Sequence, residues 1–164
     1  MKKGFSLTEL LIVLAIISMI VGTMNVQVKN KRLQAEAKNI VEVFKIYESA
    51  LSMYYLRHGA HLLPTFTGFL EEIPELQPYC PVGFKTLASI RSKRCTWFEM
   101  ISFDQEPYED LTCIYAAFNK TKEDWELAKE VRKQLEETSV PGNVNLYEEA
   151  DSLSLQLVVK WGDI

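Results

Sequence analysis

The sequence predicts an α+β fold in which a long N-terminal helix packs on a small antiparallel β-sheet, with an extra amphipathic helix near residues 121–137. Three observations predict this fold. Apolar residues recur at helical spacing, with no proline, from residue 5 to residue 57. Strand patterns separated by turn residues begin at residue 96. A helix-capping motif opens the segment 121–137.

The composition is that of a folded protein with one hydrophobic core. The chain has 164 residues, of which 48% are hydrophobic and 24% are charged, so it is not a disordered or low-complexity chain. Its formal net charge of −4 lowers the expectation that nucleic acid is its main partner. Cys80, Cys95 and Cys113 have none of the spacings typical of zinc or redox motifs. We therefore expect no metal and no cofactor.

An apolar run near the N-terminus is long enough to span a membrane. No charged residue occurs between Glu9 and Lys29, and the run from Leu10 to Val28 has about the twenty residues that a spanning helix needs. A cleaved secretory signal would require small residues before its cleavage site, and residues 20–25 lack that pattern. An ordinary anchor leaves Glu9 unexplained, because an unpaired carboxylate in an apolar helix costs on the order of 2 kcal/mol or more.

The residues before this run resemble a known processing signal. Lys2, Lys3 and Gly4 are followed by Phe5-Ser6-Leu7-Thr8-Glu9-Leu10-Leu11. This segment is similar to the cleavage and methylation signal of type IV pilins and of the pseudopilins of type II secretion. The resemblance implies that prepilin peptidase cuts between Gly4 and Phe5 and that Phe5 is then N-methylated. It covers residues 1–30 in detail and the rest of the chain as a pilin-like architecture.

The resemblance also gives Glu9 a partner in filament assembly. The α-amine of Phe5 in one copy can neutralise the Glu9 carboxylate of its neighbour, so that the pair selects the axial offset between copies. Gly4 has a local reason as well, because a residue without a Cβ lets the peptidase approach the backbone. The leader residues Lys2 and Lys3 lie on one side of the apolar run, and nearly as many positive charges lie on the other side. The positive charges therefore do not decide the orientation, and a cytoplasmic N-terminus is what the resemblance implies.

The organisation implied has three parts: a leader at residues 1–4, a transmembrane and filament-core half-helix at 5–28, and a periplasmic globular domain at 29–164 that includes an amphipathic half-helix at 29–58. The implied partners are other pilin or pseudopilin subunits in a homo- or hetero-oligomeric filament, prepilin peptidase and an inner-membrane assembly platform. The protein would be a single-pass inner-membrane protein before assembly, and part of a periplasmic or cell-surface filament (a fimbrium) afterwards. We expect a structural, minor subunit rather than an enzyme. The alternatives are an anchored periplasmic binding or adhesion module that does not polymerise, and a DNA-uptake pilus subunit.

The helical pattern continues beyond the membrane segment in two rows. The first row comprises Leu33, Ala37, Ile40, Phe44, Tyr47, Leu51 and Tyr54, and the second comprises Val43, Ile46, Ala50 and Met53. The rows are about 100° apart around the helix. Either both rows face the core, which is the favoured interpretation, or the second row packs against neighbouring subunits. Gly59 is expected to stop the helix.

Residues 59–94 are rich in glycine and proline and predict a long irregular connection, with a short helical turn near 69–76. A Cys80–Cys95 disulfide would close this connection and contribute about 3 kcal/mol. Strands are predicted at 96–103 and 111–118, paired as a hairpin that places Cys113 near Ile101 as a buried free thiol. A helix follows from Thr121 to about residue 137, and 153–161 alternates as a last strand.

The remaining candidate sites are weaker. Arg91, Lys93 and Arg94 form a basic cluster near Trp97, which suits either phosphate contact or, as the favoured interpretation, a solvated loop. The two histidines in the segment 58–61 have no nearby acidic or cysteine ligands, so we expect no metal site there. No nucleophile motif or phosphate-binding glycine loop is present, and no catalytic residue is predicted.

Overall fold

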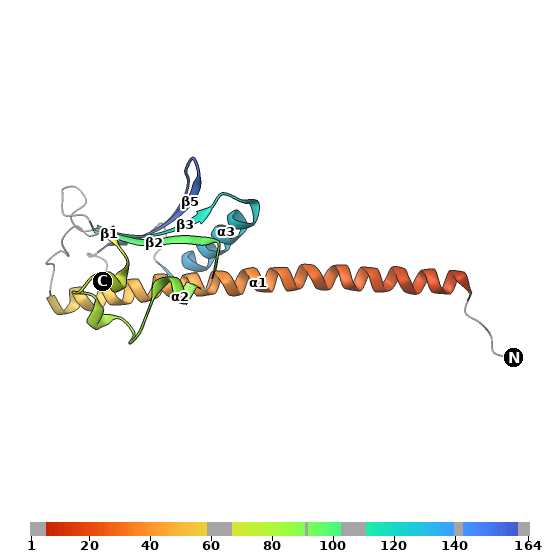
Figure 1. The fold of residues 1–164 in the computed structure, drawn as a ribbon, viewed down its shortest axis with the longest axis horizontal. Coiled ribbons are helices and arrows are strands. Elements are labelled where there is room, and N and C mark those ends of the chain that lie inside the picture. The colour runs from red at the N-terminus through yellow and green to blue at the C-terminus, as the bar shows by residue number, and fades with distance from the viewer. Residues whose placement is uncertain (1–5, 59–66, 91, 103–110, 140–142, 161–164) are drawn as a thin grey trace. The chain divides into compact units, whose positions relative to one another are not determined.

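The computed structural model describes residues 6–58, 67–90, 92–102, 111–139 and 143–160. The chain divides into two units, Met1–Gln34 and Ala35–Ile164. Helix α1 (Leu7–His58) contributes to both units, as the prediction of one long helix requires. The other helices and strands belong to the second unit (Figure 1): β1 (Thr67–Gly68), the 3₁₀ helices η1 (Leu70–Glu72) and η2 (Gln77–Tyr79), α2 (Thr86–Ile90), β2 (Cys95–Ser102), β3 (Leu111–Asn119), α3 (Lys122–Glu136), β4 (Val144–Glu148) and β5 (Ser152–Lys160).

The described part of the first unit is Ser6 and the beginning of α1, and its side chains are exposed up to Arg32. By length and composition this part of α1 can cross a membrane. Two of its polar side chains are bonded to the preceding turn: the Ser18 hydroxyl donates to the carbonyl of Leu14 at 2.8 Å, and the Thr23 hydroxyl donates to that of Ile20 at 2.9 Å. Because these hydroxyls are satisfied within the helix, they add little to the cost of an apolar environment.

The second unit is built on a five-stranded sheet in the order β1-β2-β3-β5-β4, and every neighbouring pair is antiparallel. Alternation of side chains gives it one buried and one half-exposed face. The buried face carries Phe98, Met100, Ile114, Ala116, Phe118, Leu153, Leu155, Leu157 and Val159. The predicted hairpin of β2 and β3 is confirmed, including the pairing of Cys113 with Ile101. Cys113 is buried and free, as expected.

The Ala35–His58 part of α1 supplies the opposite side of this core. Phe98 of β2 lies between two of its aromatic rings, with centroids 4.6 Å from Phe44 and 5.0 Å from Tyr47. The Tyr47 hydroxyl lies 2.9 Å from the hydroxyl of Thr86 at the start of α2. The first predicted row is buried from Ala37 onward. The second row divides, because Val43 and Ala50 are buried whereas Ile46 is half-buried and Met53 is exposed.

Helix α3 covers the other part of the same sheet face (Figure 1). Thr121 caps it, its side chain accepting a hydrogen bond from the Asp124 amide at 3.2 Å. Leu127, Ala128, Val131 and Leu135 are buried beneath it. The predicted helix near 121–137 is therefore confirmed.

Three features of the second unit differ from expectation. The strand β1 was not predicted, because two residues give no alternating pattern. β4 was not predicted, because Val-Asn-Leu-Tyr-Glu is a short strand directly after a proline-glycine turn signal. The connection between α1 and β2 is also more ordered than expected, since it contains η2 and α2 as well as the predicted helical turn at η1. The amide and hydroxyl of Thr86 both donate to the carboxylate of Glu71, at 3.0 and 2.6 Å, and so tie α2 to η1. Gly59, the expected helix stop, lies outside the described residues.

Candidate processing and assembly site

The start of α1 is a reciprocal cap formed by Ser6 and Glu9. The Ser6 amide donates to Glu9 Oε2 at 2.9 Å, and the Glu9 amide donates to Ser6 Oγ at 3.2 Å. The hydroxyl of Thr8 lies 2.8 Å from that of Ser6. This is a capping box, in which two of the unpaired amides of a helix N-terminus are satisfied by side chains. It also places the Glu9 carboxylate at the positive end of the helix dipole.

Sequence reasoning missed the role of Ser6. It assigned the compensation of Glu9 to a neighbouring subunit alone, whereas the structure shows a partner within the same chain. The signal was readable, because Ser6-Leu7-Thr8-Glu9 before an apolar run has the S-x-x-E form of a capping box. A carboxylate can accept about four hydrogen bonds, so this cap leaves room for a second donor.

The predicted processing residues come directly before this cap in the sequence. Lys2, Lys3, Gly4 and Phe5 are outside the described residues, so the geometry of the predicted cleavage point is not described. The Ser6 N–H group that donates to Glu9 is part of the Phe5–Ser6 peptide bond. A cut between Gly4 and Phe5 leaves this bond intact. The cap is therefore chemically compatible with both the uncut and the processed chain.

The three cysteines are free, so the predicted Cys80–Cys95 disulfide is absent. The Cys80 thiol donates to the Leu76 carbonyl at 3.3 Å, whereas the Cys95 thiol donates to the Trp97 carbonyl at 3.5 Å within its own strand. Burial raises the pKa of both thiols, that of Cys95 to about 12. A higher pKa lowers the thiolate fraction and slows oxidation.

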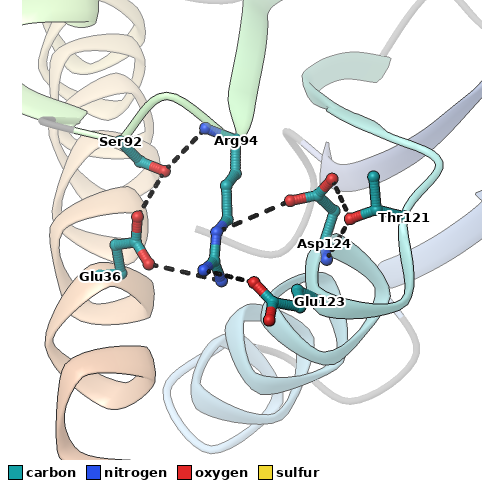
Figure 2. A network of polar contacts seen from close by, with 6 residues as sticks. All are labelled: Glu36, Ser92, Arg94, Thr121, Glu123 and Asp124. Atoms are coloured by element: carbon teal, nitrogen blue, oxygen red, sulfur yellow. Dashed lines mark hydrogen bonds and ion pairs between the residues drawn. The ribbon is translucent and has the colours of Figure 1, made fainter. Parts of the chain in front are cut away.

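Arg94, the last residue of the predicted basic cluster, is bound by carboxylates (Figure 2). Its guanidinium nitrogens lie 3.0 Å from Glu123, 3.7 Å from Glu36 and 3.8 Å from Asp124. Ser92 completes the network by donating to Glu36 at 3.0 Å. Three acidic side chains around one cation disfavour phosphate contact at this position.

The other residues of the cluster add little to that interpretation. Lys93 and Trp97 are exposed, and Arg91 lies outside the described residues.

Of the two histidines, His58 is held by aromatic residues. Its Nε2 atom lies 3.2 Å from the Tyr79 hydroxyl, and its ring stacks on Tyr54 with the ring centroids 4.6 Å apart, while His61 is outside the described part of the chain. Within that part, no three His, Cys, Asp or Glu side chains gather where they could hold a metal ion.

Comparison with known families bears on the N-terminus alone. Residues 1–24 match the family model described as the prokaryotic N-terminal methylation motif. No curated protein and no solved structure matches the chain.

Proposed function

Because residues 1–24 carry the motif that is the signature of type IV pilins and pseudopilins, we propose that this chain is a structural, minor subunit of a type IV pilus or a type II secretion pseudopilus. Prepilin peptidase cuts it between Gly4 and Phe5, and Phe5 becomes N-methylated. The processed chain polymerises through its N-terminal helix. The motif points to a structural subunit rather than an enzyme.

One observation carries this proposal: a capped carboxylate stands at the start of an exposed helix that then has no charge as far as Lys29. An apolar helix that its own chain leaves exposed needs lipid or other protein around it. The motif and the helix support a single-pass membrane anchor. In a filament, the same surface is covered by the helices of other copies.

Cleavage changes what Glu9 can bind. Before the cut, the nitrogen of Phe5 belongs to an uncharged amide, and Ser6 is the partner of Glu9. The cut turns that nitrogen into a cationic amine. Two opposite unit charges about 4 Å apart attract by about 4 kcal/mol at an effective dielectric constant of about 20. Processing therefore creates the charge that a neighbouring Glu9 recognises.

The proposal includes the location and the partners of the protein. Before assembly the second unit lies in the periplasm, anchored to the inner membrane by the first. An assembly platform in that membrane and other pilin or pseudopilin subunits are its partners. A role in DNA uptake has less support than a general structural role, because Arg94 is occupied by Glu36, Glu123 and Asp124.

Mass spectrometry of the mature chain tests the proposal against a tethered module that never polymerises. In cells with an active prepilin peptidase, we expect a chain that starts at an N-methylated Phe5. An intact N-terminus that retains Met1–Gly4 in those cells would reject the filament subunit and leave an anchored module. A cut at Phe5 without methylation would retain the cleavage assignment and reject the methylated end.

A further inference from the structure

The half-exposed face of the sheet carries two aromatic rings in solvent. In the described residues of the second unit, the large hydrophobic side chains that are exposed are Met53, Leu56, Val82, Trp97 and Tyr147. The two aromatic ones belong to the sheet: Trp97 of β2 is 53% exposed and Tyr147 of β4 is 48% exposed. Single exposed apolar side chains are ordinary, but these two rings are related by the register of the strands.

The two rings lie on one line across the sheet. Trp97 is opposite Ala117 of β3. Ala117 is opposite Ser154 of β5, which is opposite Tyr147. Three strand spacings separate Trp97 from Tyr147, which corresponds to about 14 Å between their Cα atoms. Since Ala117 and Ser154 are small and half-buried, this row has a floor of small side chains with an aromatic ring at each end.

A bulge in β2 places Trp97 on this face. The two residue steps from Cys95 to Trp97 correspond to a single step on β3, from Phe118 to Ala117. In a regular strand Trp97 would share the face of Cys95, which is buried. The bulge reverses the alternation, so that Phe98 enters the core and Trp97 is exposed. Bulges are over-represented next to functional sites, where they redirect a side chain.

The adjacent row of the same face is polar. It consists of four half-buried residues that follow one another across the strands: Glu99, Tyr115, Gln156 and Asn145. The Gln156 amide joins this row, because its Nε2 atom donates to the Tyr115 hydroxyl at 2.7 Å and its Oε1 atom accepts from Asn145 Nδ2 at 3.3 Å. The Tyr147 hydroxyl donates to the same Oε1 atom at 2.9 Å. These bonds hold the polar row and one of the two rings in place before any ligand arrives.

The polar row offers acceptors to a ligand. Glu99 Oε1 is buried without a hydrogen-bond partner in the described part of the chain. Rotation about the last side-chain bond exchanges its two oxygens, and a carboxylate has about four acceptor positions. The Tyr147 hydroxyl uses its proton for Gln156 and keeps its lone pairs as acceptors. A ligand that donates hydrogen bonds therefore suits this row.

The charge of the two rows narrows the class of ligand. Of the residues in these rows, only Glu99 is charged, and it is negative. A carboxylate with no cation in either row disfavours an anionic ligand such as a phosphate backbone. The alternation of aromatic, small and polar side chains also differs from the continuous apolar surface that receives an amphipathic helix. An uncharged ligand with apolar faces and many hydroxyl donors remains.

We propose that this face binds an extended neutral polysaccharide, with sugar rings stacked on Trp97 and Tyr147 and sugar hydroxyls bonded to the polar row. A pyranose ring has an apolar C–H face and hydroxyls around its edge, so it packs on an aromatic ring while it donates to nearby acceptors. A β-1,4-linked chain is extended and presents such faces repeatedly, which suits two rings on one line. The OB-fold likewise binds oligosaccharides on the face of a sheet. The contact needs no polymerisation and so goes beyond the proposed structural role.

Binding is measured with the full, processed chain in a detergent that has no sugar headgroup. The probes are cellohexaose and chitohexaose, the neutral β-1,4-linked hexamers of glucose and of N-acetylglucosamine, and a thymidine hexanucleotide as the anionic comparison. Saturation-transfer NMR reports which probe protons contact the protein, and a titration gives the Kd. We expect transfer to the C–H protons of at least one hexasaccharide and none to the nucleotide.

Substitution of the two rings locates the contact. Trp97→Ala and Tyr147→Ala should each weaken saccharide binding about tenfold, because each removes one stacking surface. Trp97→Phe keeps a ring and should restore most of the affinity. Val82→Ala, at an exposed apolar side chain outside the sheet, is the control and should bind as the wild type does. The urea unfolding midpoints of all four variants are compared, so that a loss of folding is not read as a loss of binding.

Three results would overturn the proposal: no transfer to either hexasaccharide, transfer to the nucleotide alone, or equal saccharide affinity in the wild-type and Trp97→Ala chains. The second result would instead assign the rings to base stacking. These measurements use unassembled chains, so they are independent of the filament function. A processed chain that binds the saccharide through Trp97 but enters no filament would retain this inference and reject the proposed function.

Discussion

The two parts of α1 have opposite surroundings although they belong to one helix. From Ala35 to His58, ten side chains are buried in the second unit, whereas from Leu7 to Gln34 the structure describes none as buried. The later part is amphipathic and finds its partner in the sheet, through Phe44 and Tyr47 against Phe98. The earlier part is apolar all round between Leu10 and Met24, which is typical of a helix surrounded by lipid or by other helices. Helix formation therefore depends on local sequence, but burial depends on where the apolar partner lies.

The largest effect on the first part of α1 is expected when cleavage of the leader that precedes it is prevented. Gly4→Leu places a bulky side chain where the peptidase must approach the backbone. We expect no chain that starts at Phe5, with normal insertion in the membrane, measured by the intact mass of the membrane fraction. Gly22→Ala is the control, because no atom lies within 4 Å of a Cβ added there. Processing of the Gly4 variant at the wild-type level would contradict the assignment.

The second part of α1 can be disrupted on its own. Phe98→Ala removes the ring between Phe44 and Tyr47 and should destabilise the second unit by about 3–5 kcal/mol. Urea unfolding of the full chain in detergent, followed by near-UV circular dichroism, measures the change. Trp97→Ala, whose side chain is exposed, should change stability by less than about 0.5 kcal/mol. Equal unfolding midpoints for the two variants would contradict this packing.

Substitutions at Glu9 distinguish the role of its negative charge from its role in the helix cap. Glu9→Gln keeps an acceptor at the third position of the helix, as capping boxes do, but loses the charge that attracts the neighbouring amine. We expect the variant to be inserted and processed normally and to assemble as poorly as Glu9→Ala, with yields reduced about tenfold or more. Sheared filament yield, normalised to processed chain in the membrane, is the readout. Wild-type yield from Glu9→Gln would show that capping, not charge, is the function of Glu9.

Ser6 should have a smaller effect. Ser6→Ala removes the acceptor of the Glu9 amide, a loss typically of about 1 kcal/mol at a helix N-cap. Hydrogen exchange at the Glu9 amide should accelerate about fivefold, and Ser6→Thr should restore most of the protection. The exchange is compared in processed chains, so that altered cleavage does not enter the result. Equal exchange in the alanine and wild-type chains would contradict the cap.

A carboxylate on the half-exposed face of the sheet gives the smallest expected effect. Burial raises the pKa of Glu99 from its usual value of 4.5, and its Oε1 atom is buried without a hydrogen-bond partner in the described part of the chain. The folded state therefore holds this proton more tightly than the unfolded state, and stability falls as pH rises from about 4.5 through the folded pKa.

Glu99→Gln removes that titration. It should reduce the decline and raise the stability of the second unit at neutral pH, because an uncharged amide costs less to bury than a carboxylate. Urea unfolding at pH values on both sides of that range measures it, with Glu126→Gln, an exposed site on α3, as the control for the charge change. A Glu99→Gln curve that keeps the wild-type pH dependence would contradict the prediction.

Local patterns in the sequence determine much of the second unit. Alternation located β2, β3 and β5 within one or two residues, and the Thr121 cap located α3, because these signals come from neighbours along the chain. β4 was missed because five residues give too short a pattern. The absent Cys80–Cys95 bridge and the ion pairs of Arg94 depend on packing between distant segments, which spacing along the chain does not specify.

At the candidate site, too, some features were predicted from the sequence and others were missed. Cleavage, methylation and Glu9 were read from the resemblance, and residues 1–24 match the corresponding motif. The contact of Glu9 with Ser6 follows from a three-residue spacing that was visible in the sequence and overlooked. The second unit also has a groove lined by α1 residues between Glu42 and Met53 and by residues 79–81. It was not predicted, because its second wall comes from a segment expected to be irregular.

Zero-length cross-linking of intact filaments tests most directly whether the first part of α1 is partnered by other copies. After carbodiimide treatment and trypsin digestion, Phe5 and Glu9 lie in one peptide that ends at Lys29. A bond between neighbouring copies joins two such peptides, whereas a bond within one copy gives a single peptide that has lost one water. We expect the joined pair, and its absence in Glu9→Gln filaments or membranes. Filaments that yield the single self-linked peptide alone would contradict the account.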